Sequence, residues 1–282
     1  QAVRDRFDII SWDPRGMGGR STPVVQCFDS AGAEAAFMAQ HFGTGIATTP
    51  EELAADGRGR AALNAACIAR NGDLLRHVST ADNARDLDLL RQAVGEETIS
   101  YYGTSYGTFL GATYINMFPD HLRAAVLDGG VSPSAWAGNA GEDVSLSTFI
   151  RLGSDLGAST TIDAFMAACG AVDAAHCAFS AGTPRDTRQK WSALLARARS
   201  GGIAYEGETV DDGAIIGYVE SSIYLVDPLP GFDRFPGYRA VAGMLQSLWQ
   251  AGDGAAKAAT DGETPAAAPA AETYLTSAGR QL

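Results

Sequence analysis

One short stretch of the chain carries residues with the spacing of a hydrolytic nucleophile. Gly103-Thr104-Ser105-Tyr106-Gly107 places a serine between two glycines in the pattern G-x-S-x-G. Because glycine lacks a Cβ atom, neighbouring elements can approach this turn closely while Ser105 projects its hydroxyl. The backbone N–H of Tyr106 falls at the expected start of a helix, where it is placed to stabilise an oxyanion. The motif predicts acyl transfer through Ser105.

The residues on either side supply the context that such a turn needs. Thr98–Tyr102 is a β-branched and aromatic run, which predicts a buried strand. After the turn, apolar residues recur at helical spacing until Pro119 ends the helix. These apolar residues are Phe109, Leu110, Tyr114, Ile115 and Phe118. The alternative is a Gly-rich turn with a solvated serine, but the order strand, turn, helix favours the nucleophile.

The elements around this turn predict an α/β architecture. Phe7–Trp12 and Arg123–Asp128 are expected to be short buried strands, and Thr80 is expected to cap a helix over Ala81–Val94. Helices are also expected within Ser30–Arg70, around a loop at Gly43–Pro50. Strands and helices in alternation predict a mostly parallel sheet with helices on both faces.

In a parallel sheet, function gathers at the carboxyl ends of the strands. Asp13, Ser105 and Asp128 each fall at such an end. The Gly-rich loop Asp13–Ser21 is either a phosphate cradle or an ordinary strand-to-helix turn. It lacks the G-K-[ST] sequence of a Walker loop.

The sequence pattern changes after Trp136, where almost no segment has the pattern of a strand. Helices are expected over Val144–Leu156 and Ile162–Cys169, from Pro184, from Asp211 or Asp212, and over Tyr238–Trp249. Several helices in succession after a sheet strand predict a helical cap inserted over the active site. The stretch from Ala251 to Ala271 is rich in Ala, Gly, Thr and Pro, which predicts a linker. We therefore expect a partial core over residues 1–135, a cap over 136–250 and a linker over 251–282.

Composition and charge exclude some classes of partner. The chain has 282 residues and a formal net charge of −12, which argues against nucleic acid or an anionic membrane surface. No apolar run is long enough to span a bilayer, and no zinc-type cluster of cysteine and histidine is present in the sequence. We expect neither a metal nor another cofactor.

Four cysteines are present. The number of cysteines is even, and Cys169 and Cys177 lie close together in sequence. Both observations favour the disulfides Cys27–Cys67 and Cys169–Cys177. Such bonds imply an oxidising compartment. The alternative is four buried free thiols.

Several segments resemble the proline iminopeptidase and tripeptidyl aminopeptidase branch of the α/β-hydrolases. Asp13–Ser21 resembles a D-x-R-G-x-G-x-S segment of that family, with one extra residue before the serine. Tyr101–Gly111 resembles the nucleophile elbow of secreted actinobacterial tripeptidyl aminopeptidases, which is the strand, turn and helix that carry the catalytic serine. Thr80–Arg91 resembles the helix before that elbow, and Phe118–Gly129 resembles the strand after it. The resemblance covers residues 5 to 135, and the cap only in general character.

The resemblance implies a secreted serine exopeptidase that releases short peptides from a free N-terminus. It also implies a Ser-Asp-His triad, no metal and an acyl-enzyme on Ser105; we expect a monomer. An esterase on the same fold is an alternative, because the elbow does not choose between amides and esters. A non-catalytic protein without a complete triad is a third possibility.

The family's other catalytic parts have no counterpart in the sequence. No H-G-G-P-G loop precedes Phe7, and the family's acid and histidine would follow the cap. We therefore expect a fragment of a longer hydrolase, inactive alone. None of the histidines, His41, His77, His121 and His176, is expected to act as the general base.

Two further roles fall on acidic residues. Asp128 is a candidate alternative triad acid because it ends the strand after the elbow helix, although an Asp before two glycines also suits a turn. An exopeptidase needs a carboxylate for the substrate's α-ammonium group. Glu220 is the candidate, with Glu142 and Asp143 as others, and a solvated helix face is the alternative for Glu220.

Overall fold

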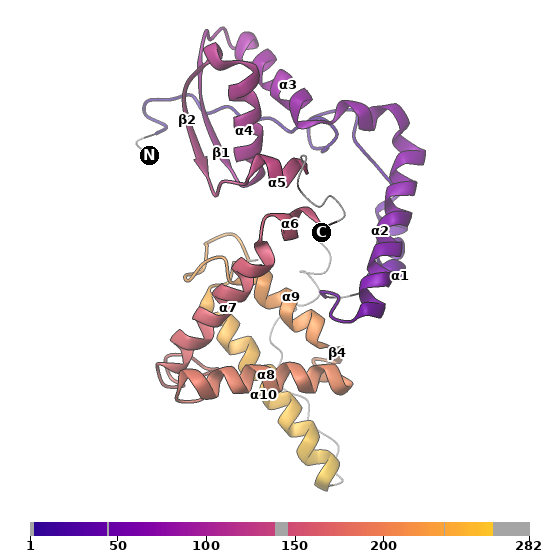
Figure 1. Cartoon of the computed structure of the whole chain (residues 1–282), viewed down its shortest axis with the longest axis vertical. Helices are drawn as coiled ribbons and strands as arrows, with labels where there is room; N and C mark the ends of the chain where they lie inside the picture. Colours follow the sequence, from indigo (N-terminus) through magenta and orange to yellow (C-terminus); the bar gives the residue numbers. More distant parts are fainter. Residues whose placement is uncertain (1–2, 44, 139–145, 234, 262–282) are drawn as a thin grey trace. The chain divides into compact units, whose positions relative to one another are not determined.

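The computed structural model describes residues 3–43, 45–138, 146–233 and 235–261, and only the backbone over 253–261. Its residues form two compact units (Figure 1). The first comprises Gln1–Gln40 and Arg58–Ser154, and the second comprises His41–Gly57 and Asp155–Leu282. The division into core, cap and linker stays a prediction, and most of the expected linker, 262–282, lies outside the described residues.

The first unit is built on two parallel strands, β1 (Ile99–Thr104) and β2 (Leu122–Asp128). Both lie within two residues of their predicted bounds. The register pairs Tyr102 with Val126 and Thr104 with Asp128, so the two strands end at the same edge. The face that carries Tyr102 and Val126 is open, with 65% and 56% of these side chains exposed.

Helix α4 (Tyr106–Met117) packs against both strands, and α3 (Thr80–Ala93) packs against α4 (Figure 1). Their shared apolar core consists of Ala84, Leu87, Leu110 and Tyr114. The predicted cap of α3 is wrong by one residue. Ser79 is the N-cap, because its hydroxyl accepts from the Asp82 N–H and the Asp82 carboxylate accepts from the Ser79 N–H in a capping box.

The predicted strand over Phe7–Trp12 is wrong. The segment is not in a ladder, and Phe7, Ile9 and Ile10 are 49%, 66% and 55% exposed. A strand needs a neighbour to satisfy its backbone groups, and among the described residues β1 and β2 pair with each other. The apolar run alone therefore does not make it a strand.

Asp88 of α3 is a buried carboxylate on which four side chains converge. It accepts hydrogen bonds from Arg91 Nε at 2.8 Å, Gln92 Nε2 at 2.8 Å and the Tyr114 hydroxyl at 3.1 Å, and His121 Nδ1 lies 2.6 Å away. These partners, Arg91 first, hold the pKa of Asp88 well below its ordinary range. Burial and the bond to Asp88 raise the pKa of Tyr114 to about 12. This cluster, the Asp88 hub, joins α3, α4 and the 3₁₀ turn η2 (Pro119–His121) before β2.

Two helices follow the N-terminal loop, α1 (Ala31–His41) and α2 (Pro50–Asn71), as the sequence pattern predicts. The disulfide between Cys27 and Cys67 joins the segment before α1 to the last turns of α2, which confirms that pairing. Two short helices, α5 (Pro133–Ala137) and α6 (Thr148–Arg151), complete the first unit.

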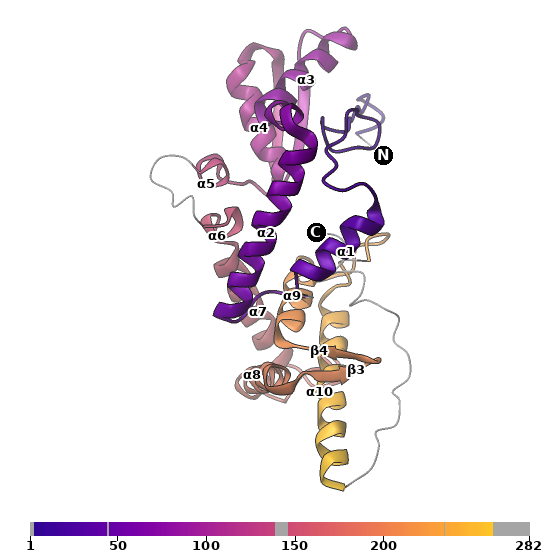
Figure 2. The same ribbon diagram turned by 90° about the vertical axis from the view of Figure 1, so that its right-hand side faces the viewer.

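Helices dominate the second unit (Figure 2). They are α7 (Ser154–Gly170), α8 (Pro184–Gly201), α9 (Asp212–Ser222) and α10 (Tyr238–Asp261). The predicted helix over Val144–Leu156 begins outside the described residues and is otherwise divided between α6 and α7, because Gly153 lies between them at φ 72°. Helix α10 continues to Asp261, beyond the apolar pattern that ends at Trp249, and this extension is rich in alanine, the strongest helix former.

Sequence analysis missed a small hairpin that packs on α10 (Figure 2). Strands β3 (Ile203–Tyr205) and β4 (Glu208–Val210) pair antiparallel around Glu206 and Gly207, at φ 51° and 85°. Two consecutive residues with positive φ suit the tight turn of a two-residue hairpin. Strands of three residues are too short to give a clear alternating pattern.

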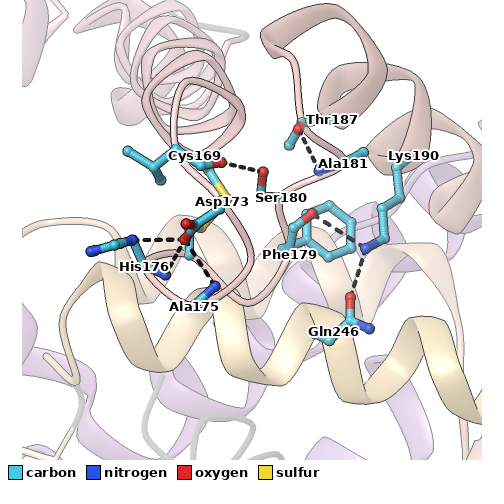
Figure 3. The surroundings of a disulfide bond; sticks show 12 residues. Cys169, Asp173, Ala175, His176, Phe179, Ser180, Ala181, Thr187, Lys190 and Gln246 are labelled. Carbon is cyan, nitrogen blue, oxygen red and sulfur yellow. Dashed lines mark hydrogen bonds and ion pairs between the residues drawn. A yellow bond between two sulfur atoms is a disulfide. The ribbon is translucent and has the colours of Figure 1, made fainter.

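The second disulfide, Cys169–Cys177, closes the loop after α7 and confirms the other predicted pairing (Figure 3). Within this loop, His176 Nδ1 lies 2.7 Å from Asp173 Oδ1. The chain then enters the core at Phe179, whose ring lies under the Lys190 ammonium group at 4.5 Å. The disulfide thus fixes a loop that leads directly into the core of the second unit.

None of the helices that the structure describes combines the length and apolarity needed to cross a bilayer.

The Asp88 hub gives a stability prediction. We expect Asp88→Asn to lower the free energy of unfolding by about 3 kcal/mol, because Arg91 would keep a charge without its buried partner. Urea unfolding of wild type and variant measures this cost. Asp120→Asn, at an exposed position beside the hub, is the control and should change stability by less than about 0.5 kcal/mol.

The same variant tests the lowered pKa. A carboxyl with a depressed pKa in the folded state stabilises the fold above its unfolded pKa, and this stabilisation is lost as the pH falls through the folded value. The difference in stability between wild type and Asp88→Asn should therefore narrow as the pH falls below about 4. A difference that stays constant down to acid unfolding would contradict the assigned direction.

The two disulfides should differ in their contribution. Their cysteines are 40 and 8 residues apart in sequence. If a disulfide acts by lowering the entropy of the unfolded chain, the bond that closes the longer loop stabilises the fold by about 4 kcal/mol and the other by about 2.5 kcal/mol. We expect the pair Cys27→Ala and Cys67→Ala to destabilise the protein more than Cys169→Ala and Cys177→Ala, as measured by thermal unfolding without reductant. Equal losses would show that loop entropy does not set the ranking.

Candidate active site

Ser105 occupies the sharp turn between β1 and α4. Its backbone lies at φ 54° and ψ −123°, which is a strained conformation for a residue with a Cβ atom. Its side chain is exposed. The Ser105 N–H donates to the Asp128 carbonyl at 3.1 Å, and the Ser105 carbonyl accepts from the Thr108 N–H at 2.8 Å and hydroxyl at 2.7 Å. These bonds hold the strained turn at the end of the sheet from both sides.

Two glycines let α4 approach β1 closely enough to make this turn. A Cβ atom on Gly103 would lie 2.5 Å from the Gly107 carbonyl oxygen, and one on Gly111 would lie 2.5 Å from the Tyr101 ring. The Tyr101 hydroxyl donates to the Gly107 carbonyl at 2.7 Å, and burial raises the pKa of Tyr101. Tyr101 and Gly111 both lie in the segment that resembles the family's elbow, but the sequence pattern did not predict their packing against each other. The available signal was the spacing of Gly107 and Gly111, which lie four residues apart on one face of α4.

Tyr106 is the first residue of α4, where sequence analysis expects an oxyanion donor. The first N–H groups of a helix have no partner within it and carry the positive end of its dipole. The Tyr106 hydroxyl lies 2.9 Å from the Thr80 hydroxyl of α3, which fixes the ring. The position suits the predicted role, and the role itself stays a prediction.

Asp128 ends β2 beside the turn, as its predicted role as an acid requires. Its exposed carboxylate accepts from the Tyr102 hydroxyl at 3.4 Å, while its carbonyl binds the Ser105 N–H. The backbone carbonyl of Asp128 therefore helps to hold the turn at Ser105 in place. No histidine of the first unit hydrogen-bonds its carboxylate in the part of the chain that the structure describes, so its catalytic role stays a prediction.

Neither histidine of the first unit hydrogen-bonds Ser105 among the described residues. His121 is held by Asp88 at the opposite edge of the sheet, just before β2 begins. The twelve residues of α4, about 18 Å of helix, separate that end from the turn. His77 has an exposed ring whose Nε2 lies 3.6 Å from Asp73. The other two histidines, at positions 41 and 176, belong to the second unit.

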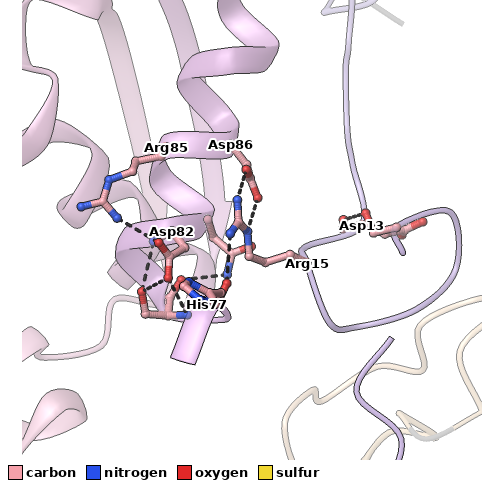
Figure 4. A network of polar contacts seen from close by, with 9 residues as sticks. Asp13, Arg15, His77, Asp82, Arg85 and Asp86 are labelled. Carbon is pink, nitrogen blue, oxygen red and sulfur yellow. Dashed lines mark hydrogen bonds and ion pairs between the residues drawn. The ribbon is translucent and has the colours of Figure 1, made fainter. Parts of the chain in front are cut away.

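The Gly-rich loop after Trp12 is held by hydrogen bonds rather than left open as a phosphate cradle (Figure 4). The Asp13 carboxylate accepts from the Arg20 N–H at 2.8 Å, and the Ser21 hydroxyl donates to the Asp13 carbonyl. Arg15 donates to both carboxylate oxygens of Asp86 in α3, at 2.7 and 2.5 Å, and this pair raises the pKa of Arg15. The loop therefore anchors the N-terminal segment to α3.

The roles of the candidate ammonium-binding residues stay predictions. Glu220 lies on α9 in the second unit and is partly exposed, whereas Glu142 and Asp143 lie outside the described residues. Among the residues that the structure describes, no three His, Cys, Asp or Glu side chains gather as a metal site.

Comparison with known proteins gives a consistent family. A sequence profile of the alpha/beta hydrolase fold matches residues 1–197. Tripeptidyl aminopeptidase of Streptomyces lividans is 37% identical over 128 residues, which is 45% of this chain and 23% of that protein. Serine protease Hip1 of Mycobacterium tuberculosis is 36% identical over 137 residues, covering 47% and 25%. Carboxylesterase B of the same species is 38% identical over 135 residues, covering 45% and 24%. The matched segment thus spans about a quarter of the length of these relatives.

The strain at Ser105 can be measured apart from any activity. Ser105→Gly removes the Cβ atom from a left-handed backbone, whereas Ser105→Ala keeps it. We expect the glycine variant to be more stable than the alanine variant by about 1 kcal/mol, as measured by urea unfolding. The same pair at Ser100 in β1 is the control. At Ser100 the glycine variant should be less stable than the alanine variant by about 0.5 to 1 kcal/mol. If the glycine variant were the less stable one at Ser105 as well, this would count against a strained turn.

Proposed function

The chain belongs to the alpha/beta hydrolase fold family, and from that premise we propose that it carries the nucleophile of a serine hydrolase, Ser105. The observation that carries this proposal is the strained and exposed serine between a parallel strand and the N-terminus of a helix. A strained turn is retained where the surrounding structure over-determines it and where its geometry is used.

The proposed mechanism is acyl transfer. A histidine removes the proton from Ser105 Oγ, the oxygen attacks the scissile carbonyl, and an acyl-enzyme forms with loss of the leaving group. The histidine gives that proton to the leaving group as it departs. It then removes a proton from a water molecule that attacks the acyl carbon, and it returns this proton to Ser105 Oγ when the acid product is released. The Tyr106 N–H, at the positive end of α4, stabilises the oxyanion in both steps. None of the four histidines of this chain is proposed as that base, and Asp128 is an alternative acid.

The proposed substrates are peptides with a free N-terminus. Two of the relatives are named as a tripeptidyl aminopeptidase and a serine protease, and this naming supports peptide bonds as the target. In this proposal Glu220 binds the α-ammonium group of the substrate, and the protein acts as a monomer in an oxidising compartment outside the cytosol. The two disulfides support that location.

A second candidate is an esterase that uses the same serine. The similarity to carboxylesterase B supports it, because the elbow serves esters and amides alike. A non-catalytic protein is the remaining alternative, since no histidine of the first unit reaches Ser105 by a hydrogen bond within the described residues.

One experiment separates these functions. The protein is expressed from its complete reading frame and treated with a fluorophosphonate, with Ser105→Ala as the control. We expect labelling of wild type alone and cleavage of tripeptide amides with a free N-terminus. Faster cleavage of simple acyl esters than of any peptide would favour the esterase. Labelling of neither protein would leave the non-catalytic alternative.

The role of Glu220 has its own test. Glu220→Gln should lower kcat/KM for a free-amine tripeptide amide by about tenfold to a hundredfold, because a charge-assisted hydrogen bond is lost. The kcat/KM for the same peptide with an acetylated N-terminus should not change. Glu208→Gln, at an exposed position on β4, is the matched control. Unchanged discrimination between free and blocked peptides would remove Glu220 from the site.

A further inference from the structure

Four aromatic side chains gather around the first turn of α4, the turn that follows Ser105 in the first unit. Tyr106 and Phe109 come from the first turn of α4, Trp136 from α5 and Phe149 from α6. The Trp136 ring centroid lies 5.6 Å from that of Tyr106, 6.3 Å from Phe109 and 6.4 Å from Phe149. These separations are those of rings in contact. We call this group the aromatic cluster, and it is joined to the candidate nucleophile by the peptide bond between Ser105 and Tyr106.

The backbone around the cluster is fixed by one arginine. Arg151 at the end of α6 donates to the carbonyl of Ala135 at 2.8 Å and to that of Trp136 at 3.2 Å. It also donates to the Leu146 carbonyl at 2.5 Å. One guanidinium group therefore ties α5 to α6 and holds Trp136 at a set position. The hydroxyl bond between Tyr106 and Thr80 fixes the opposite side of the cluster.

The cluster is not part of the buried core. Tyr106, Phe109 and Trp136 are partly exposed, and Phe149 is 63% exposed. The core of the first unit lies further along α3 and α4, around Tyr114. Rigid, half-exposed rings of this kind present a large apolar surface without the entropic cost of ordering flexible side chains on binding. They are thus suited to bind an apolar group next to Ser105.

We propose that the aromatic cluster sets substrate specificity by binding an apolar side chain on the acyl residue, the one whose carbonyl Ser105 attacks. The inference rests on the proposed function. The acyl residue is the relevant one because it stays attached to Ser105 through both half-reactions, whereas the leaving group departs after the first. A wall of rings beside Ser105 therefore contacts the acyl residue in both transition states. Trp136, which touches the other three rings, is the specificity-determining residue.

The test compares two peptide phosphonates that modify the serine of such enzymes, one carrying a phenylalanine-like side chain and one a glycine-like side chain. The rate constant for labelling of Ser105 is measured on the protein expressed from its complete reading frame. We expect the phenylalanine-like probe to react faster, and Trp136→Ala to reduce that preference by about tenfold or more while leaving the glycine-like rate nearly unchanged. Phe232→Ala, an exposed aromatic position in the second unit, is the control. Labelling with an unchanged preference in Trp136→Ala would overturn the inference and leave the nucleophile in place.

A binding measurement keeps the inference testable if Ser105 does not react with either probe. Ser105→Ala is titrated with two tripeptides that differ only in a C-terminal Phe or Asp, and isothermal titration calorimetry measures binding. We expect the peptide ending in Phe to bind about tenfold more tightly, and Trp136→Ala to abolish the difference. Equal affinities would overturn the aromatic cluster as a recognition surface. Failure of labelling alone would instead count against the proposed function.

Discussion

The local structure around Ser105 depends on how closely α4 approaches β1. Gly103 and Gly111 have no room for a Cβ atom, and the Tyr101 ring and hydroxyl lie in the space between strand and helix. This close contact leaves a single residue to reverse the chain direction, so that residue takes a left-handed backbone. The hydrogen bond from the Ser105 N–H to the Asp128 carbonyl then fixes the turn to the neighbouring strand. Exposure of the Ser105 hydroxyl follows from this backbone geometry.

The two ends of α4 carry different chemistry. Near its C-terminus, the Asp88 hub gathers a guanidinium group, an amide, a phenol and an imidazole around one carboxylate. Polar groups that are buried and mutually paired stabilise one arrangement and leave little free for catalysis. At its N-terminus the backbone N–H of Tyr106 lacks a helical partner, and aromatic side chains lie along the first turn. Structure is thus secured at one edge of the sheet, while the other edge keeps reactive groups accessible.

Sequence reasoning found what is local and periodic. The strand, the turn and the helix around Ser105, both disulfides and most helices follow from residue type and spacing. It failed where an element depends on a distant partner, as with Phe7–Trp12, whose apolar run forms no strand without a neighbour. It also missed contacts between segments far apart in sequence, such as Arg15 with Asp86 and Arg151 with the carbonyls of α5. No pattern along the chain encodes which distant carbonyl an arginine will meet.

The aromatic cluster also bears on how an oxyanion would be stabilised. Hydrogen-bond donors act more strongly where water and its high dielectric constant are excluded. In the proposed complex, an apolar substrate side chain lying on the rings of α4, α5 and α6 would exclude water from the neighbourhood of the Tyr106 N–H. The same contact would then serve binding and transition-state stabilisation. For this reason, a substrate that fills the cluster should gain in the rate of acylation as well as in affinity.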